Sequence, residues 1–379
     1  MAKIRILLVG DGNSIFVTSY AKWLKKENID FQVDIFSTSV IRDENTSFFD
    51  RVIRIEQYPH FYFINKYKGI RRILLISIYR KVLKDLPAYD FVHFQFISPL
   101  RYSLINLIKR TTKSKIVLSI WGSDLYKLNP IDKISFKNIC LKADKISMAN
   151  PQTIEYFKSA FNWKKDNIRE CRFGLSPLEN ITELSLDKAA CKEELGWNKD
   201  KLAVVIGYNA AQGQQHLRIL EQLSHDQIIA LKEKILLVLP LSYGGSASYK
   251  KDILSAMREL PFEYISYQQY LSDFEIACLR KASDIMIQLQ VKDQFSGSMQ
   301  EHIFAGNVVV TGKWLPYKSM KDLGIYFEDI EDVADLKDML PEIIRNFRQY
   351  QEKTSCNEAK IADLSLWGNN ISNWSKLYK

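Results

Sequence analysis

The stretch that decides the fold covers residues 284–312 and reads DIMIQLQVKDQFSGSMQEHIFAGNVVVTG. Its apolar start, residues 284–290, predicts a short buried strand, and its Val-rich end predicts a second strand. Between them lie a loop of small residues at 296–298 and a helical segment that ends at Gly306. The loop is therefore expected at a helix N-terminus, where unpaired backbone N–H groups favour anions such as phosphate.

Two acids, Asp293 and Glu301, flank this loop eight positions apart. An ionised carboxylate only accepts hydrogen bonds, so acids beside an anion site suit a ligand that also brings hydroxyl groups. A nucleotide sugar carries both phosphates and hydroxyls. The alternative is an ordinary strand–loop–helix turn with two solvated acids.

The block resembles the E-x7-E signature of retaining glycosyltransferases with the GT-B fold, in particular glycosyltransferase family 4. Asp293 stands where that family usually has Glu. The resemblance implies an α/β fold of two Rossmann-like domains whose mostly parallel sheets face a cleft. It also implies that the second domain binds the donor, with Glu301 accepting hydrogen bonds from ribose hydroxyls and Asp293 approaching the sugar.

Length and composition fit a two-domain globular protein. The chain has 379 residues, which is too long for one typical hydrophobic core. Of these residues 46% are hydrophobic and 26% charged, as in ordinary globular proteins. Its five cysteines form no C-x-x-C pair, so we expect neither a disulfide framework nor a zinc site, and a reducing cytoplasm is the natural compartment. No apolar run is long enough for a signal peptide or for a membrane span of roughly 18 residues.

The net charge of +9 predicts an anionic partner. Basic residues concentrate in region 66–115, where only Asp85 and Asp90 are acidic. They are Lys66, Lys68, Arg71, Arg72, Arg80, Lys81, Lys84, Arg101, Lys109, Arg110, Lys113 and Lys115. With the interleaved aromatics, this region predicts a surface that binds anionic lipids, hence a peripheral location at the inner face of the membrane. The alternative is a helix pair with an apolar core face; no nucleic-acid-binding module is recognised.

A glycine-containing turn follows the first predicted strand, Ile4–Val9. It comprises Gly10, Asp11, Gly12 and Asn13. The full G-x-G-x-x-G fingerprint is missing, so a dinucleotide site is disfavoured. We expect this turn on the acceptor side of the cleft.

A second acceptor-side turn follows the strand predicted at 115–120. It comprises Trp121, Gly122, Ser123 and Asp124. It resembles the H-G-S-D turn of many family 4 enzymes, with Trp121 in place of His, which removes a titratable group. Asp124 is either a third candidate catalytic residue, contacting acceptor hydroxyls, or a helix N-cap.

The second half restarts the strand–helix pattern at Leu202–Gly207, after a polar stretch, 179–199, that we interpret as the linker. The loop 208–216 contains neither Arg nor Lys, which family 4 enzymes usually place there, and it looks closer to the fucosamine transferases of enterobacterial common antigen synthesis. A Ser-Tyr-Gly turn after the next strand can donate N–H and hydroxyl groups to phosphate. Tyr267 and Tyr270 are candidates to border the nucleobase. The predicted donor-binding residues are Gly207, Tyr208, Gln212, Ser242, Tyr243, Gly244, Tyr267, Ser296, Gly297, Ser298 and Glu301.

We accordingly place an acceptor domain at 1–183 and a donor domain at 184–361, with a C-terminal helix at about 362–379 packing back on the first domain. The predicted function is transfer of a sugar from a nucleotide sugar to a glycan or polyprenyl-diphosphate-linked acceptor in bacterial surface polysaccharide synthesis, such as lipopolysaccharide or capsule. The family 4 likeness implies retention of anomeric configuration, and the fucosamine transferase likeness implies inversion. No D-x-D motif is evident, so we expect no metal and no cofactor beyond the co-substrate.

Three other functions stay open from the sequence. They are a GT-B-type sugar-nucleotide epimerase, a nicotinamide-dependent oxidoreductase and a non-catalytic partner of a glycan-assembly complex.

Overall fold

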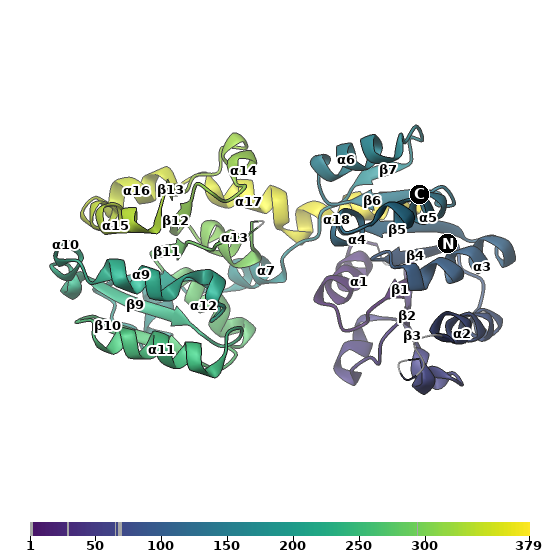
Figure 1. Ribbon diagram of the computed structural model, residues 1–379, viewed down its shortest axis with the longest axis horizontal. Coiled ribbons are helices and arrows are strands. Elements are labelled where there is room, and N and C mark those ends of the chain that lie inside the picture. The colour runs from purple at the N-terminus through teal and green to yellow at the C-terminus, as the bar shows by residue number, and fades with distance from the viewer. Residues whose placement is uncertain (1–2, 29, 65, 67–69, 294) are drawn as a thin grey trace. The chain divides into compact units, whose positions relative to one another are not determined.

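The computed structural model describes residues 3–28, 30–64, 66, 70–293 and 295–379. The chain forms two compact units, which are described separately (Figure 1). Unit 1 comprises Met1–Gly174 and Trp367–Lys379, and unit 2 comprises Leu175–Leu366. The chain therefore passes from unit 1 to unit 2 once and returns once.

Unit 1 is built on a seven-stranded sheet in the order β3-β2-β1-β4-β5-β6-β7. The strands are β1 (Ile4–Gly10), β2 (Phe31–Ser37), β3 (Arg51–Arg54), β4 (Phe91–Gln95), β5 (Lys115–Ile120), β6 (Lys145–Met148) and β7 (Ile168–Glu170). All neighbouring strands are parallel. The strand order reverses between β1 and β4, which is where open α/β sheets place ligands at their carboxyl edge.

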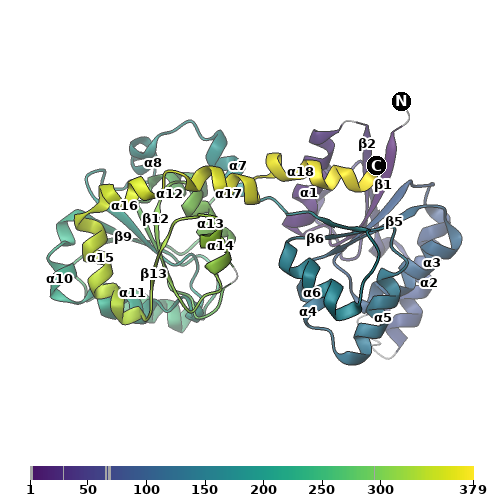
Figure 2. The ribbon, with the colours of Figure 1, turned by 90° about the horizontal axis from the view of Figure 1, so that it is seen from above.

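Helices cover both faces of this sheet because its strands are apolar on both sides. They are α1 (Ile15–Glu27), α2 (Arg71–Asp85), α3 (Tyr102–Thr111), α4 (Ser123–Tyr126), α5 (Pro130–Cys140), α6 (Pro151–Phe161) and α18 (Trp367–Ser375). One core cluster joins the sheet to α2, α3, α5 and α6, and the other joins it to α1 and α18. Figure 2 shows α18 lying beside α1.

The C-terminal segment is anchored in unit 1 by aromatic burial and a chain of buried polar groups. Trp367 and Trp374 are at most 1% exposed. The Tyr378 hydroxyl lies 2.5 Å from His93 Nδ1 and 2.5 Å from the Tyr20 hydroxyl. His93 Nε2 in turn lies 2.6 Å from Ser119 Oγ. Burial lowers the pKa of His93 to about 3, so this side chain is a neutral part of the core.

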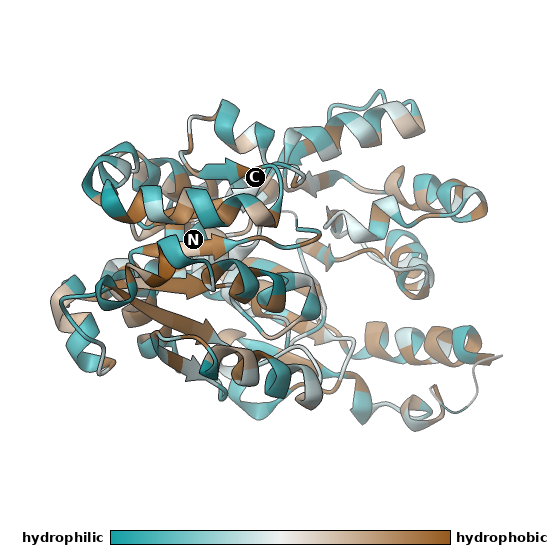
Figure 3. Cartoon of the chain, turned by 60° about the vertical axis from the view of Figure 1, so that its left-hand side comes forward, coloured by the Kyte–Doolittle hydropathy of each residue, from teal (hydrophilic) through white to brown (hydrophobic). Residues whose placement is uncertain are grey.

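Unit 2 has a six-stranded sheet in the order β10-β9-β8-β11-β12-β13, again with all neighbours parallel. Its strands are β8 (Leu202–Ile206), β9 (Ile235–Pro240), β10 (Glu263–Tyr267), β11 (Ile285–Gln288), β12 (Val308–Gly312) and β13 (Glu328–Ile330). Figure 3 shows predominantly brown, hydrophobic strands, as parallel strands buried on both faces require. The predicted α/β fold with two Rossmann-like, parallel-sheet domains is confirmed.

The helices of unit 2 are α7 (Ser176–Glu183), α8 (Lys188–Glu194), α9 (His216–Leu223), α10 (Asp226–Ile229), α11 (Ala247–Arg258), α12 (Asp273–Ala282), α13 (Gly297–Phe304), α14 (Lys318–Asp322), α15 (Leu336–Arg345), α16 (Phe347–Lys353) and α17 (Asn357–Ser365). The strand–loop–helix–strand prediction for 284–312 corresponds to β11, α13 and β12.

The interpretation of 179–199 as a linker is wrong. Leu178 and Ile181 of α7 pack in one buried cluster with Met299, and Cys191 of α8 packs in another with Cys278. The division between the units therefore falls at 174/175, nine residues before the predicted 183/184, and the return falls at 366/367 instead of 361/362. The linker interpretation failed because apolar residues are spaced along these polar helices. Those residues are buried against unit 2, so the segment is not a solvated linker.

Candidate functional site

A pocket of about 350 Å³ lies at the carboxyl edge of the sheet of unit 2. Its walls come from the segments that follow β8, β9, β10 and β11, and from α7, α12 and α13. The lining residues are Pro177, Tyr208, Pro240, Ser242, Tyr243, Tyr270, Leu271, Ile276, Leu279, Arg280, Ser296, Gly297, Ser298 and Glu301. Seven predicted donor-binding residues are thus brought together around one cavity.

A larger cavity, about 900 Å³, lies in unit 1 against Ile4, Phe91 and Lys115. These residues are at the amino ends of β1, β4 and β5. Parallel sheets bind ligands at the opposite edge, so position outweighs size and we take the smaller pocket as the site.

The N-terminus of α13 forms one wall of the pocket. Ser296 is the N-cap, and its Oγ accepts a hydrogen bond from the Met299 N–H at 3.4 Å. Among the contacts described, the N–H groups of Gly297 and Ser298 have no acceptor. Free N–H groups at a helix N-terminus make a site for an anion.

Glu301 and Arg280 form a buried ion pair at the base of this wall. Arg280 Nε donates to Glu301 Oε2 at 2.9 Å, and the two side chains are 9% and 10% exposed. Arg280 Nη2 also donates to Ser298 Oγ at 3.0 Å. Sequence reasoning missed Arg280. It lies at the end of a predicted helix beside Lys281, and no spacing rule shows which of the two side chains turns inward.

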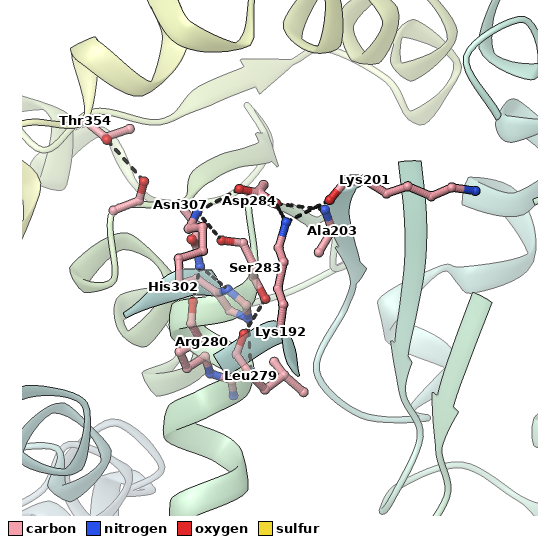
Figure 4. Close-up of polar contacts among 12 residues, drawn as sticks. Lys192, Lys201, Ala203, Leu279, Arg280, Ser283, Asp284, His302, Asn307 and Thr354 are labelled. Atoms are coloured by element: carbon pink, nitrogen blue, oxygen red, sulfur yellow. Dashed lines mark hydrogen bonds and ion pairs between the residues drawn. The ribbon is translucent and has the colours of Figure 1, made fainter. Parts of the chain in front are cut away.

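Behind this pair, polar contacts link α12 and α13 to the start of β12 (Figure 4). Asn307 Nδ2 donates to the Arg280 carbonyl at 2.8 Å and lies 2.8 Å from His302 Nδ1. Burial, together with the charge of Arg280, lowers the pKa of His302 well below its ordinary value. Nearby, the buried Asp284 accepts from Lys192 Nζ and from the Ala203 N–H, both at 2.9 Å. The site thus rests on a fixed polar framework.

Asp293 does not line the pocket. Its Oδ2 accepts from the Ser296 N–H at 3.0 Å and from the Tyr317 hydroxyl, and Gln288 Nε2 lies 3.4 Å away. Burial and this hydrogen bond raise the pKa of Tyr317, which therefore stays a donor. Through these hydrogen bonds Asp293 Oδ2 shapes the loop before α13. Asp293 and Glu301 therefore do not line the same cavity.

The remaining residues predicted to bind the donor do not line the pocket. Gly207 and Gly244 have φ of +63° and +74°, so they shape the turns after β8 and β9 without lining the pocket. Gln212 is exposed and outside the lining. Tyr267 is not among the lining residues, since its hydroxyl accepts from Trp197 Nε1 at 2.8 Å and its ring packs on a buried apolar cluster. Tyr270 lines the pocket instead, with its ring parallel to that of Tyr243 at 5.9 Å.

Asp124, the third candidate catalytic residue, makes structural hydrogen bonds to the backbone. It is 6% exposed, and it accepts backbone N–H groups of Ile97, Trp121 and Gly122, each at 2.9 Å. Burial raises its pKa to about 6, while the three N–H groups oppose that shift. These three hydrogen bonds hold the end of β4 to the turn after β5.

The other acceptor-side predictions lie at the carboxyl edge of the sheet of unit 1. Gly10 ends β1, and Gly12 is close-packed, since a Cβ there would lie 2.4 Å from Ile41 Cδ1. Asp11 accepts from Ser39 Oγ at 2.5 Å, and Asn13 Nδ2 donates to the Val40 carbonyl at 2.7 Å.

In the second turn, Trp121 packs edge-on against Phe16, Phe96 and Phe173 at 5.3–5.9 Å between ring centroids. Gly122 adopts φ +100°, and Ser123 is exposed at the start of α4. The structure thus brings the two predicted turns to one edge of one sheet, with an aromatic cluster between them.

Within the described residues, no group of three or more His, Cys, Asp or Glu side chains could hold a metal ion. No helix in the part of the chain that the structure covers is both long and apolar enough to cross a bilayer.

Comparison with known proteins agrees with this geometry. Residues 5–152 match a family model described as glycosyl transferase 4-like. The predicted resemblance to glycosyltransferase family 4 is confirmed over these residues, whereas the likeness to the fucosamine transferases is not. No curated protein matches the chain by sequence.

Three solved structures share the fold over nearly the whole chain. A glycosyltransferase from Rickettsia africae ESF-5 is 15% identical with a TM-score of 0.71, covering 100% of this chain and 98% of its own. HepE from Anabaena in complex with UDP is 11% identical with a TM-score of 0.66, covering 98% and 99%. The UDP-GlcNAc 2-epimerase from Neisseria meningitidis bound to UDP-GlcNAc is 14% identical with a TM-score of 0.66, covering 98% and 100%. At these identities the likeness shows the GT-B fold.

Proposed function

We propose that this chain transfers a sugar from a nucleotide-sugar donor to a glycan or polyprenyl-diphosphate-linked acceptor. The observation that carries the proposal is the pocket of unit 2, where a capped helix N-terminus and a buried carboxylate line one cavity. A ligand with a diphosphate and hydroxyl groups matches both features. The UDP complex of the similarly folded Anabaena protein supports a nucleotide in this class of fold.

In this proposal, the N–H groups of Gly297 and Ser298 face the diphosphate, and Ser242 and Tyr243 border it. Glu301 holds Arg280 through Oε2, and its Oε1 accepts from a ribose hydroxyl. Asp293 keeps the loop before α13 in place, and its second carboxylate oxygen accepts from the sugar hydroxyls. The two turns of unit 1, at 10–13 and 121–123, bind the acceptor.

The chemistry required is departure of a diphosphate. The bond between the anomeric carbon and the phosphate oxygen breaks with its electron pair on the diphosphate, while the acceptor oxygen bonds to carbon and loses its proton. Fixed N–H donors stabilise the departing charge, and one such donor contributes about 3 kcal/mol.

A ligand screen followed by a transfer assay tests the proposal. UDP-, GDP- and dTDP-sugars are compared by thermal shift, since a ligand at 100 times its dissociation constant stabilises by about 2.7 kcal/mol. The sugar nucleotide that binds is then incubated with and without a polyprenyl-diphosphate-linked glycan. We expect turnover only with the acceptor. Turnover of the donor alone would favour the epimerase, and absence of binding by all three would contradict the proposal.

We further propose retention of anomeric configuration and independence from metal. NMR of the product's anomeric proton tests the first, and an inverted product would contradict it. Transfer in the presence of EDTA tests the second, and activity that is lost with EDTA and restored by Mg²⁺ would overturn it.

We also propose that unit 1 binds an anionic membrane surface through α2, which fits a cytoplasmic, peripheral enzyme of surface polysaccharide synthesis. Ile73 is 68% exposed on α2, beside the exposed Arg80 and Lys81. Lys68, part of the predicted basic region, lies outside the described residues. Sedimentation with phosphatidylglycerol vesicles should fall with salt and in an Arg80→Glu, Lys81→Glu variant; binding equal to that of neutral vesicles would contradict the proposal.

A further inference from the structure

Arg280 is the one cationic side chain among the residues that line the donor pocket, within the part of the chain that the structure describes. It is buried and held in place at three atoms. Nε donates to Glu301 Oε2 at 2.9 Å, and Nη2 donates to Ser298 Oγ at 3.0 Å. Nη1 lies 3.0 Å from His302 Nε2 (Figure 4 shows both of these side chains). The guanidinium plane is therefore fixed before any ligand binds.

These contacts leave donor capacity on Arg280. A guanidinium has five N–H groups. Burial keeps His302 neutral, and its Nε2 accepts from Nη1 only in the tautomer that carries the ring proton on Nδ1. The described contacts therefore occupy at most three N–H groups, and at least one on each of Nη1 and Nη2 remains. Two N–H groups on neighbouring nitrogens form the fork that matches two oxygens of a phosphate.

The pocket also needs positive charge. A nucleoside diphosphate is strongly anionic, yet the loop after β8, residues 207–216, contains no Lys or Arg. Glu301 adds a negative charge to the lining, and the N-terminus of α13 supplies only about half an elementary charge. Without Arg280 the described lining would carry a net negative charge against an anionic ligand.

We propose that Arg280 binds the diphosphate of the nucleotide donor through its two remaining N–H groups while it holds Glu301 in position. The inference rests on the proposed function and adds the residue that supplies the charge. Lysine could not replace arginine here, because a single ammonium cannot reach Glu301, Ser298 and a phosphate in one geometry.

Binding of uridine, UMP and UDP to the full-length chain, measured by isothermal titration calorimetry, separates the two roles. In Arg280→Gln we expect UDP affinity to fall by about 10- to 100-fold, because charge-assisted hydrogen bonds to phosphate are lost. Uridine affinity should change much less. In Glu301→Gln, uridine and UDP should lose affinity by the same factor. Lys281→Gln is the matched control, since Lys281 Nζ donates to the carbonyls of Leu184 and Leu186, outside the pocket.

Equal losses for uridine and UDP in Arg280→Gln would show a merely structural role and overturn the inference. If Arg280→Gln does not fold, Arg280→Lys decides: it keeps the charge and loses the fork, so a selective loss for UDP over uridine supports the inference and an equal loss overturns it. If the wild type prefers GDP or dTDP, the same series is run with that nucleoside. Wild-type chain that binds none of the three diphosphates overturns the proposed function itself, which distinguishes that failure from a failure of the role of Arg280.

Discussion

At the scale of single residues, burial decides which polar side chains are available for chemistry. Asp124 and Asp293 both accept N–H groups of their own or neighbouring loops, so they keep turns in shape. Glu301 is different, since one of its oxygens binds Arg280 in the pocket lining. The buried histidines follow the same logic, because a neutral imidazole costs less to bury than a charged one.

Acid should destabilise unit 1 through His93. Its pKa is about 3 in the folded chain against an ordinary 6.5, so the unfolded chain binds the proton first as the pH falls. Stability from this group is complete above pH 6.5 and falls by about 1.4 kcal/mol per unit below it, hence about 2 kcal/mol at pH 5. Urea unfolding of the wild type and of His93→Gln at pH 7 and pH 5 checks this. The variant should lose about 2 kcal/mol less, and equal losses would contradict the assignment.

Gly207→Ala should destabilise unit 2 and weaken donor binding. Residue 207 has φ +63°, which costs an L-residue about 1–2 kcal/mol. A Cβ there would also lie 2.9 Å from Gln214 Oε1. The control is Gly213→Ala, where a Cβ would meet no heavy atom within 4 Å. Thermal unfolding and UDP titration of both variants give the comparison; a similar effect of the two substitutions would show that the turn tolerates a side chain.

At the scale of elements, the helix α13 links stability and binding. Ser296 is the N-cap, and its Oγ accepts a hydrogen bond from the Met299 N–H. The N–H of Ser296 itself donates to Asp293 Oδ2. Gly297 and Ser298, whose N–H groups lie between these two along the chain, are lining residues of the pocket. Capping therefore orients the free donors that we assign to the diphosphate.

Ser296→Ala should lower both stability and donor affinity. Loss of a Ser N-cap costs about 1 kcal/mol. Ser246 offers a matched control, since it caps α11 by accepting from the Tyr249 N–H at 3.2 Å and does not line the pocket. Both variants should melt earlier by a similar amount, and only Ser296→Ala should bind UDP more weakly. Equal UDP affinity of the two would place the diphosphate elsewhere.

At the scale of the whole molecule, the pocket belongs to one continuous segment of the chain. All of its lining residues lie between Pro177 and Glu301 in unit 2. The ends of that unit are adjacent, because the Leu175 N–H donates to the Ser365 carbonyl at 2.8 Å. Unit 1, by contrast, is completed by the returning C-terminal segment, whose Trp367 and Trp374 are buried in its core.

The two units should therefore differ as isolated fragments. A fragment of residues 175–366 should fold and bind UDP, which titration calorimetry can measure. A fragment of residues 1–174 should be unstable, since loss of a buried Trp alone costs about 3–5 kcal/mol. Circular dichroism and thermal unfolding of the two, with residues 1–174 and 367–379 joined by a linker as the control, test this. A stable 1–174 fragment would contradict the role given to the C-terminal helix.

Local pattern was sufficient for much of this protein. Alternating apolar strands and amphipathic helices predicted two parallel-sheet units, and the Ser-Gly-Ser loop at 296–298 predicted a helix N-terminus at a sheet edge. Glu301 was predicted in the site because it and Asp293 flank that loop eight positions apart and resemble the E-x7-E signature. These features depend on residues close in the sequence, where periodicity and capping act.

Contacts between distant residues could be decided only by the tertiary structure. Asp124 binds the Ile97 N–H across 27 positions, and Arg280 binds Glu301 across 21. The order of strands in the sheet decides which strand ends lie beside a carboxylate, and so whether it is hydrogen-bonded. Local sequence spacing does not predict that order. For the same reason Tyr267 packs against a core cluster while Tyr270 lines the pocket, and the polar helices α7 and α8 join unit 2. Folding buries whichever surface completes a core.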